Sequence, residues 1–346
     1  MAVMALGSRL AALSDYVARR SEGTQVLSSA TPLGGGACQD IVRLDVLERE
    51  APRALVLRSD ATTSLPGSIG RHAEHAVIGA ARRAGVPTPE ARWLEADLLR
   101  PGAQAFVMDL VPGVAVGAKV LRSPSLAAAR ELLPEQLAGA LAAIHRVTPQ
   151  DLPADLTLSE LGVRRGARDA PAAALAFLVR MLDLLPEPHP ALELVHRWLD
   201  QHRPTPSPIV LVHGDFRMGN FLVSETGLTA VLDWEFAHLG SPAEDLGWLC
   251  VRDWRFGQLT RPAAGLTSRA AFLALYRAAG GLPLTLDELR WWEVYGNARW
   301  AAGAAWQGER VLGGGEANLE LVAIPRRAAE MEWEALRLIR LAEREV

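Results

Sequence analysis

Lysine is nearly absent from this sequence: Lys119 is the only one among 36 basic residues. Cysteine is scarce too, with Cys38 and Cys250 far apart and in no metal-binding or redox spacing, which favours a reducing compartment. No apolar run reaches the roughly 18 residues of a membrane-spanning helix, and the best candidate is interrupted by Arg180. The net charge is −4 and no block of like charge occurs, so the sequence has no charged segment typical of binding to nucleic acid or to an acidic membrane. We therefore expect a soluble, cytoplasmic protein, and the composition leaves its oligomeric state open.

The first part of the chain has the pattern of strands with accompanying helices. Leu10, Leu13 and Val17 recur at helical spacing and predict an amphipathic first helix. Residues 26–59 read as strands with a glycine-rich turn, and residues 72–84 predict a helix. With 346 residues, 49% of them hydrophobic, the chain is long enough for two domains or one bilobal unit with a substantial core.

The pattern changes near residue 113. The segments ARWLEAD and QAFVMDL predict the last two strands of the first part. Beyond Ser123 helical spacing dominates, except for three short apolar runs, PIVLV, NFLVS and TAVLDW, that predict a compact β segment. The order of elements indicates an α+β protein with a lobe boundary near residue 113.

The most informative stretch is HGDFRMGN, from His213 to Asn220, followed by LDWE with Asp233. Asp215 is predicted on the loop after a strand, Asn220 opens the next strand and Asp233 ends the one after, so a β-hairpin brings these three side chains together. Magnesium prefers carboxylate, amide and phosphate oxygens, and phosphoryl transfer needs a metal, positioning and a proton acceptor. Asp215 therefore fits the acceptor, and Asn220 and Asp233 fit magnesium ligands.

The combined motif resembles the catalytic loop and the metal-binding motif of the aminoglycoside phosphotransferase and choline kinase superfamily, relatives of the protein kinases. The stretch GSPAEDLGW, with Asp245, matches the aspartate segment that follows in such kinases. The resemblance implies a bilobal protein-kinase-like fold, with a small β-rich N-lobe at residues 1–112 and a larger helical C-lobe at residues 113–346. It also implies that ATP and Mg²⁺ bind between the lobes and that the partner is a hydroxylated small molecule.

The resemblance also assigns roles within the catalytic loop. Asp245 would hold the loop without touching substrate. Arg217 falls where protein kinases place a lysine that contacts the transferred phosphate. His213 is a candidate for chemistry, and the alternative is that it braces the loop through hydrogen bonds.

On the nucleotide side, the stretch LGGGACQD resembles the turn that covers the phosphates in this family. Gly34, Gly35 and Gly36 would allow close backbone approach, although an ordinary hairpin turn has the same composition. The stretch VMDLVPG resembles the hinge between the lobes. There the backbone groups from Asp109 to Val111 would meet adenine.

The family also holds the α- and β-phosphates with a strand cation paired to a glutamate on the next helix. Glu74 matches the glutamate, but the matching strand position is Arg58, where better-known relatives carry lysine. The sole Lys119 lies past the hinge, so either Arg58 supplies this charge or no residue does. The alternative for Arg58 is a surface arginine on an edge strand. Arginine is permanently charged and binds phosphate through two N–H groups, so the role is physically available to it.

The sequence says less about the substrate that accepts the phosphoryl group than about the nucleotide side. Polycationic aminoglycosides need clustered carboxylates, whereas the chain beyond Thr285 interleaves 11 acidic with 8 basic residues as on an ordinary surface. Seven of the ten tryptophans follow residue 240; they either pack helices or line an acceptor pocket. The overall pattern most resembles kinase domains associated with acyl-CoA dehydrogenases, which implies a hydroxylated carboxylic acid or its CoA thioester as substrate.

Three other functions stay open on the sequence. A nucleotide-binding pseudokinase is suggested by Arg58, although the complete set of Asp215, Asn220 and Asp233 opposes it. A metal-dependent hydrolase would use the same carboxylates but needs further ligands. A kinase of aminoglycosides or other antibiotics would share the whole motif.

Overall fold

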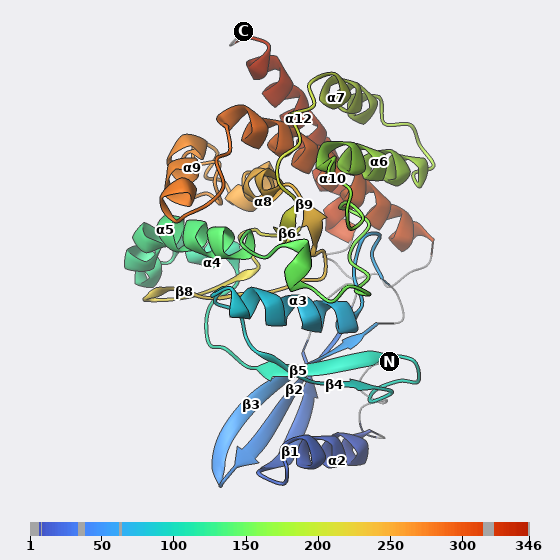
Figure 1. The fold of residues 1–346 in the computed structure, drawn as a ribbon, viewed down its shortest axis with the longest axis vertical. Coiled ribbons are helices and arrows are strands. Elements are labelled where there is room, and N and C mark those ends of the chain that lie inside the picture. The colour runs from blue at the N-terminus through green and yellow to red at the C-terminus, as the bar shows by residue number, and fades with distance from the viewer. Residues whose placement is uncertain (1–6, 8, 34–38, 62–63, 314–321, 345–346) are drawn as a thin grey trace.

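The computed structural model describes residues 7, 9–33, 39–61, 64–313 and 322–344. Within this part of the chain, an antiparallel sheet forms one end of the molecule and a larger helical part forms the other (Figure 1). This arrangement confirms the predicted α+β fold with a small β-rich lobe and a larger helical lobe. None of the described helices is both long and apolar enough to cross a bilayer.

The N-terminal sheet has the strand order β1-β2-β3-β5-β4, and each neighbouring pair is antiparallel. Its strands are β1 (Gln25–Pro32), β2 (Gln39–Glu48), β3 (Ala51–Asp60), β4 (Ala91–Ala96) and β5 (Gln104–Asp109). Two helices accompany it, α2 (Leu10–Arg20) and α3 (Arg71–Arg83). The predicted strands and both predicted helices are confirmed.

The two helices lie on opposite faces of this sheet. Successive side chains of a strand point to opposite faces, and on β5 Val107 joins the apolar cluster with α2 whereas Phe106 joins the larger core with α3. The inward positions of α2 are Leu13, Tyr16 and Val17. Leu10, which the sequence pattern placed on the apolar face, is exposed because it begins the helix beyond the edge of this cluster.

The helical part is organised around one long helix. Its helices are α4 (Gly117–Arg122), α5 (Ala127–Ile144), α6 (Ala170–Asp183), α7 (Pro190–Gln201), α8 (Pro242–Leu249), α9 (Arg269–Ala278), α10 (Leu286–Leu312) and α12 (Arg327–Ala342). The central α10 contacts α6, α7, α8, α9 and α12. Trp291, Trp292 and Tyr295 on α10 pack together inside the core, so these two tryptophans serve helix packing.

Four short strands flank the segments that carry Asp215, Asn220 and Asp233. They are β6 (Val210–Val212), β7 (Phe221–Ser224), β8 (Gly227–Val231) and β9 (His238–Gly240). β7 and β8 form the predicted hairpin, whereas β6 pairs with β9 and not with β7. Asp233 does not end β8, as the sequence suggested, because the strand stops at Val231 and Asp233 adopts a left-handed backbone with φ of +68°. That conformation is rare outside glycine and is common at functional sites.

Candidate active site

The loop from His213 to Asn220 is fixed at its base by a buried carboxylate on α8. Asp245 Oδ2 accepts a hydrogen bond from the His213 backbone N–H at 2.8 Å, and Oδ1 accepts one from the Gly214 N–H at 3.0 Å. Burial alone raises the pKa of a carboxyl group, but His145, 3.3 Å away, and the backbone donors outweigh burial and lower the pKa of Asp245. Asp245 therefore stays ionised and anchors the loop to the helix behind it.

Asp215 lies on this loop as a nearly buried carboxylate that accepts hydrogen bonds from three side chains. Trp248 Nε1 donates to Oδ1 at 2.8 Å, and Asn220 Nδ2 donates to Oδ2 at 2.6 Å. Arg217 Nε lies 3.0 and 3.2 Å from the two oxygens. Charge-assisted hydrogen bonds from several directions hold a carboxylate in one orientation, as a proton acceptor requires.

Asn220 and Asp233 are brought side by side by the backbone. The Asn220 carbonyl accepts a hydrogen bond from the N–H of Leu232, the residue before Asp233, at 2.8 Å. The Asn220 amide nitrogen is committed to Asp215, which leaves its Oδ1 oxygen for another partner. An amide oxygen next to a carboxylate and a second carboxylate fits magnesium, which prefers such ligands. The predicted group of Asp215, Asn220 and Asp233 is therefore assembled in one place.

Arg58 reaches this group from the N-terminal sheet. Its guanidinium lies 2.8 Å from Glu74 Oε1 on α3 and 2.9 Å from Asp233 Oδ1, and its side chain is only 8% exposed. Burial by itself lowers the pKa of an arginine, but the two carboxylates outweigh it and raise the pKa of Arg58 further. Glu74 also pairs with Arg71 on its own helix. A fixed positive charge therefore bridges the sheet, α3 and the loop of Asp233.

His213 is fully buried, and both of its ring nitrogens have hydrogen-bond partners. Nε2 lies 3.0 Å from the Leu232 carbonyl, and Nδ1 accepts the Asp215 backbone N–H at 3.2 Å. Burial lowers the pKa of His213, so the imidazole is neutral, with its proton on Nε2. This geometry is that of a brace between the loop and the segment carrying Asp233.

The remaining predicted positions concern the nucleotide. Gly34, Gly35 and Gly36 lie outside the described residues. The Asp109 side chain at the end of β5 pairs with Arg53 and Arg92 on the neighbouring strands. The N–H of the next residue, Leu110, donates to the Ala54 carbonyl at 3.2 Å.

The sequence reasoning did not assign the residues that surround Asp215 on the side of the helical part. Besides Trp248, they include Trp254, whose ring lies 4.4 Å from the Arg217 guanidinium carbon, and Arg299 on α10. A signal was available for Trp248. It follows Asp245 by three residues, and side chains at that spacing share one helix face.

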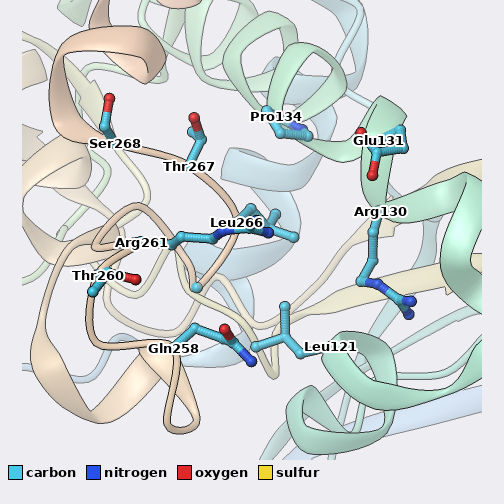
Figure 2. A pocket seen from close by; sticks show the side chains of 11 residues that line it. Leu121, Arg130, Glu131, Pro134, Gln258, Thr260, Arg261, Leu266, Thr267 and Ser268 are labelled. Carbon is cyan, nitrogen blue, oxygen red and sulfur yellow. The ribbon is translucent and has the colours of Figure 1, made fainter.

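A separate hollow of about 580 Å³ lies between α5 and the loop that precedes α9 (Figure 2). Its lining is polar and includes Arg130, Glu131, Gln258, Arg261 and Ser268. None of the predicted site residues lines it. The Arg130 guanidinium is committed to the carbonyls of Val120 and Ser123. The chemistry of the described residues therefore gathers around Asp215 and not in this hollow.

Comparison with known proteins gives one family and several relatives. The family model described as the phosphotransferase enzyme family matches residues 29–292. Acyl-CoA dehydrogenase family member 10 of Mus musculus is 30% identical over 215 residues, which is 58% of this chain. The matched region spans only 18% of that mouse protein's length.

Solved structures share the fold. A candidate aminoglycoside phosphotransferase from Ralstonia eutropha has a TM-score of 0.69 at 23% identity, covering 94% of this chain and 97% of its own. A macrolide 2'-phosphotransferase from Brachybacterium faecium has a TM-score of 0.57 at 22% identity, covering 93% of this chain and 98% of its own. A thermostable mutant of an aminoglycoside phosphotransferase, solved with AMP-PNP and hygromycin B, has a TM-score of 0.56 at 17% identity, covering 95% and 98%.

Proposed function

We propose that this chain, which belongs to the phosphotransferase enzyme family, transfers the γ-phosphoryl group of ATP to a hydroxyl group of a small molecule. The observation that carries the proposal is the meeting of Asp215, Asn220 and Asp233 at one point, with Arg58 reaching them from the N-terminal sheet. These groups supply a proton acceptor, oxygen ligands for a metal ion and a fixed cation, which are the groups that phosphoryl transfer requires.

In this mechanism Asp215 accepts the proton of the acceptor hydroxyl. The hydroxyl oxygen forms a bond to the γ-phosphorus while the bond from that phosphorus to the β–γ bridging oxygen breaks, and ADP leaves with the electron pair. Arg217, now paired with Asp215, has a half-buried guanidinium that would neutralise charge on the phosphoryl oxygens. His213 and Asp245 hold the loop and take no part in the proton transfer.

Magnesium would be held by Asn220 Oδ1 and the Asp233 carboxylate. When bound, it neutralises charge on the phosphates and orients them. Arg58 donates a hydrogen bond to Asp233, and this bond restrains the carboxylate. Arg58 Nε is buried without a hydrogen-bond partner among the described residues, and a phosphate oxygen is an acceptor suited to it.

The adenine would meet the backbone at the end of β5. The N–H of Leu110 is already used by the Ala54 carbonyl of β3. We therefore assign the contacts with the purine edge to the backbone groups of its neighbours Asp109 and Val111.

We infer that the acceptor is a hydroxylated carboxylic acid or its thioester and not a polycation. Three carboxylates of the helical part are already paired with arginine: Asp253 with Arg327, Glu244 with Arg299, and Glu293 with Arg255. A polycationic acceptor could use these carboxylates only by breaking the pairs. Apart from the Asn220 amide, the side chains that donate to Asp215 are cationic or aromatic, and similarity to the mouse acyl-CoA dehydrogenase relative supports the same acceptor class.

Replacing Arg58 by methionine keeps the volume of the side chain and removes its charge. We expect the affinity for Mg·ATP to fall about 10- to 100-fold, because a charge-assisted hydrogen bond contributes about 1.5–3 kcal/mol. Isothermal titration calorimetry with AMP-PNP measures this loss. Arg43→Met is the control, since Arg43 is an exposed arginine of the adjacent strand paired with Asp45. Equal affinities of the two variants for Mg·ATP would show that Arg58 does not contribute to nucleotide binding.

Thermal unfolding with AMP-PNP and Mg²⁺ tests the proposed function directly. A ligand at 100 times its Kd stabilises the native state by about 2.7 kcal/mol, so wild-type Tm should rise. Asp233→Asn should lose the magnesium-dependent part of the rise, because an amide carries no charge for the cation. A wild-type Tm that does not change at saturating nucleotide would contradict the proposal. Turnover is then measured with a panel of hydroxy acids, their CoA thioesters and aminoglycosides.

A further inference from the structure

The Asp215 carboxylate has a tryptophan as one of its hydrogen-bond donors. Trp248 Nε1 lies 2.8 Å from Asp215 Oδ1, and the indole is only 4% exposed. Trp248 is on α8, the same helix that carries the loop anchor Asp245. One short helix therefore fixes both the backbone of the loop and the orientation of its central carboxylate.

The indole is itself held in place by a buried arginine of α10. The Arg299 guanidinium carbon lies 3.7 Å from the centre of the Trp248 ring, a cation–π contact. Arg299 also donates to the Gly214 carbonyl at 2.5 Å and pairs with Glu244 at 3.3 Å. These contacts join α8, α10 and the loop through the Arg299 side chain. A turn of the indole would break its cation–π contact with this fixed arginine.

The packing of α8 against α10 leaves space for this ring and little more. A Cβ at Gly296 on α10 would lie 3.4 Å from Trp248 Cε3 and 2.8 Å from Val251 Cγ2. Trp254 packs against the same indole, with ring centres 5.7 Å apart. Arg217 differs from Trp248 in this respect, because its side chain is 26% exposed and has room to move.

A carboxylate needs such a partner to act as an oriented base. The terminal torsion of aspartate is broad, so the chain alone does not select one direction for its oxygens. Asn220 fixes Oδ2, and Trp248 fixes Oδ1. With both oxygens tied to immobile donors, the lone pairs that remain point to one place. A shift of about 1 Å in such a group can slow a reaction by about 100-fold.

We propose that Trp248 is a positioning residue for phosphoryl transfer, holding Oδ1 of Asp215 through its indole N–H while Arg299 fixes the ring. The inference rests on the proposed function of Asp215 as the proton acceptor. It goes beyond helix packing, because packing requires the ring but not its N–H group.

Trp248→Phe separates these two requirements, since it keeps an aromatic ring over Arg299 and removes the donor. The matched control is Trp291→Phe. Trp291 is equally buried and loses a comparable hydrogen bond, from Nε1 to the Leu199 carbonyl at 3.0 Å, in the core of the helical part. We expect kcat of Trp248→Phe to fall about 10- to 100-fold with KM for ATP unchanged. Trp291→Phe should lower Tm and keep kcat within about twofold.

A spectroscopic readout needs no acceptor. In protein labelled with ¹⁵N-tryptophan, the indole signal missing from Trp248→Phe identifies Trp248. That signal should move in Asp215→Asn, while the Trp291 signal stays in place. The role of Trp248 would be overturned if its indole signal had the same chemical shift in Asp215→Asn as in the wild type. A kcat of Trp248→Phe equal to that of Trp291→Phe would overturn it as well. Failure of the wild type to phosphorylate any acceptor would instead count against the proposed function, because the indole measurement is independent of turnover.

Discussion

Asp215→Asn is expected to reduce phosphoryl transfer by about 10³-fold or more while nucleotide binding is retained. A positioned base contributes about 10²–10⁴-fold to such a reaction, and an amide cannot accept the proton. The neighbours of Asp215 also lose one of its two acceptor oxygens and its charge, although Trp248, Asn220 and Arg217 all donate to those oxygens. In our proposal Arg58, Asp233 and Asn220 Oδ1 hold the nucleotide and its magnesium, and the Asn220 bond to Asp215 runs through Nδ2 and not through that oxygen. Initial rates with the identified acceptor and titration with AMP-PNP measure the two properties separately.

Asp183→Asn provides the control for this substitution, because Asp183 is an exposed carboxylate at the end of α6. It should leave both rate and binding unchanged. If Asp215→Asn kept turnover within about tenfold of the wild type, Asp215 would not be the base, because a base contributes at least about 10²-fold. Loss of nucleotide binding together with turnover would indicate that the substitution disturbs the whole loop. A melting curve decides whether the fold is intact.

Asp245→Asn is expected to destabilise the folded protein strongly. The Asp245 carboxylate is fully buried, and it accepts the N–H groups of His213 and Gly214 while facing His145. An asparagine keeps one oxygen and places an NH₂ group against a backbone donor. A hydrogen bond to a charged group contributes about 1.5–3 kcal/mol, and the loop of Asp215 loses its anchor. Urea unfolding at pH 7 should therefore show a lower midpoint, and turnover should be lost as well.

The same carboxylate predicts how stability depends on pH. Because the folded state lowers the pKa of Asp245, its ionised form stabilises the fold at every pH above the value of an unfolded aspartate, about 3.9. That contribution disappears as pH falls through the lower pKa of the folded state. The difference in stability between wild type and Asp245→Asn should thus stay constant from pH 7 to pH 5 and shrink below about pH 4. A difference that grows in acid would contradict this assignment.

The fold and the core of the site followed from local features of the sequence. The strands of residues 26–59, the helix at residues 72–84 and the helical second half are confirmed because two- and three-to-four-residue periodicities report burial directly. Asp215, Asn220 and Asp233 could be grouped because a hairpin joins neighbouring strands of known spacing. Arg58 and Glu74 were paired by resemblance, and in the structure they lie 2.8 Å apart.

Tertiary packing decided the rest. The pairing of β6 with β9, the exposure of Leu10 and the left-handed backbone of Asp233 depend on which surfaces meet, and periodicity along one segment does not encode that. The ion pair of Arg58 with Asp233 joins residues 175 positions apart. The hydrogen bond from Trp248 to Asp215 also depends on tertiary packing, because Arg299 of α10 holds the indole. By itself the sequence indicated which residues are candidates for the chemistry, and only the packing of distant elements determined which partners orient them.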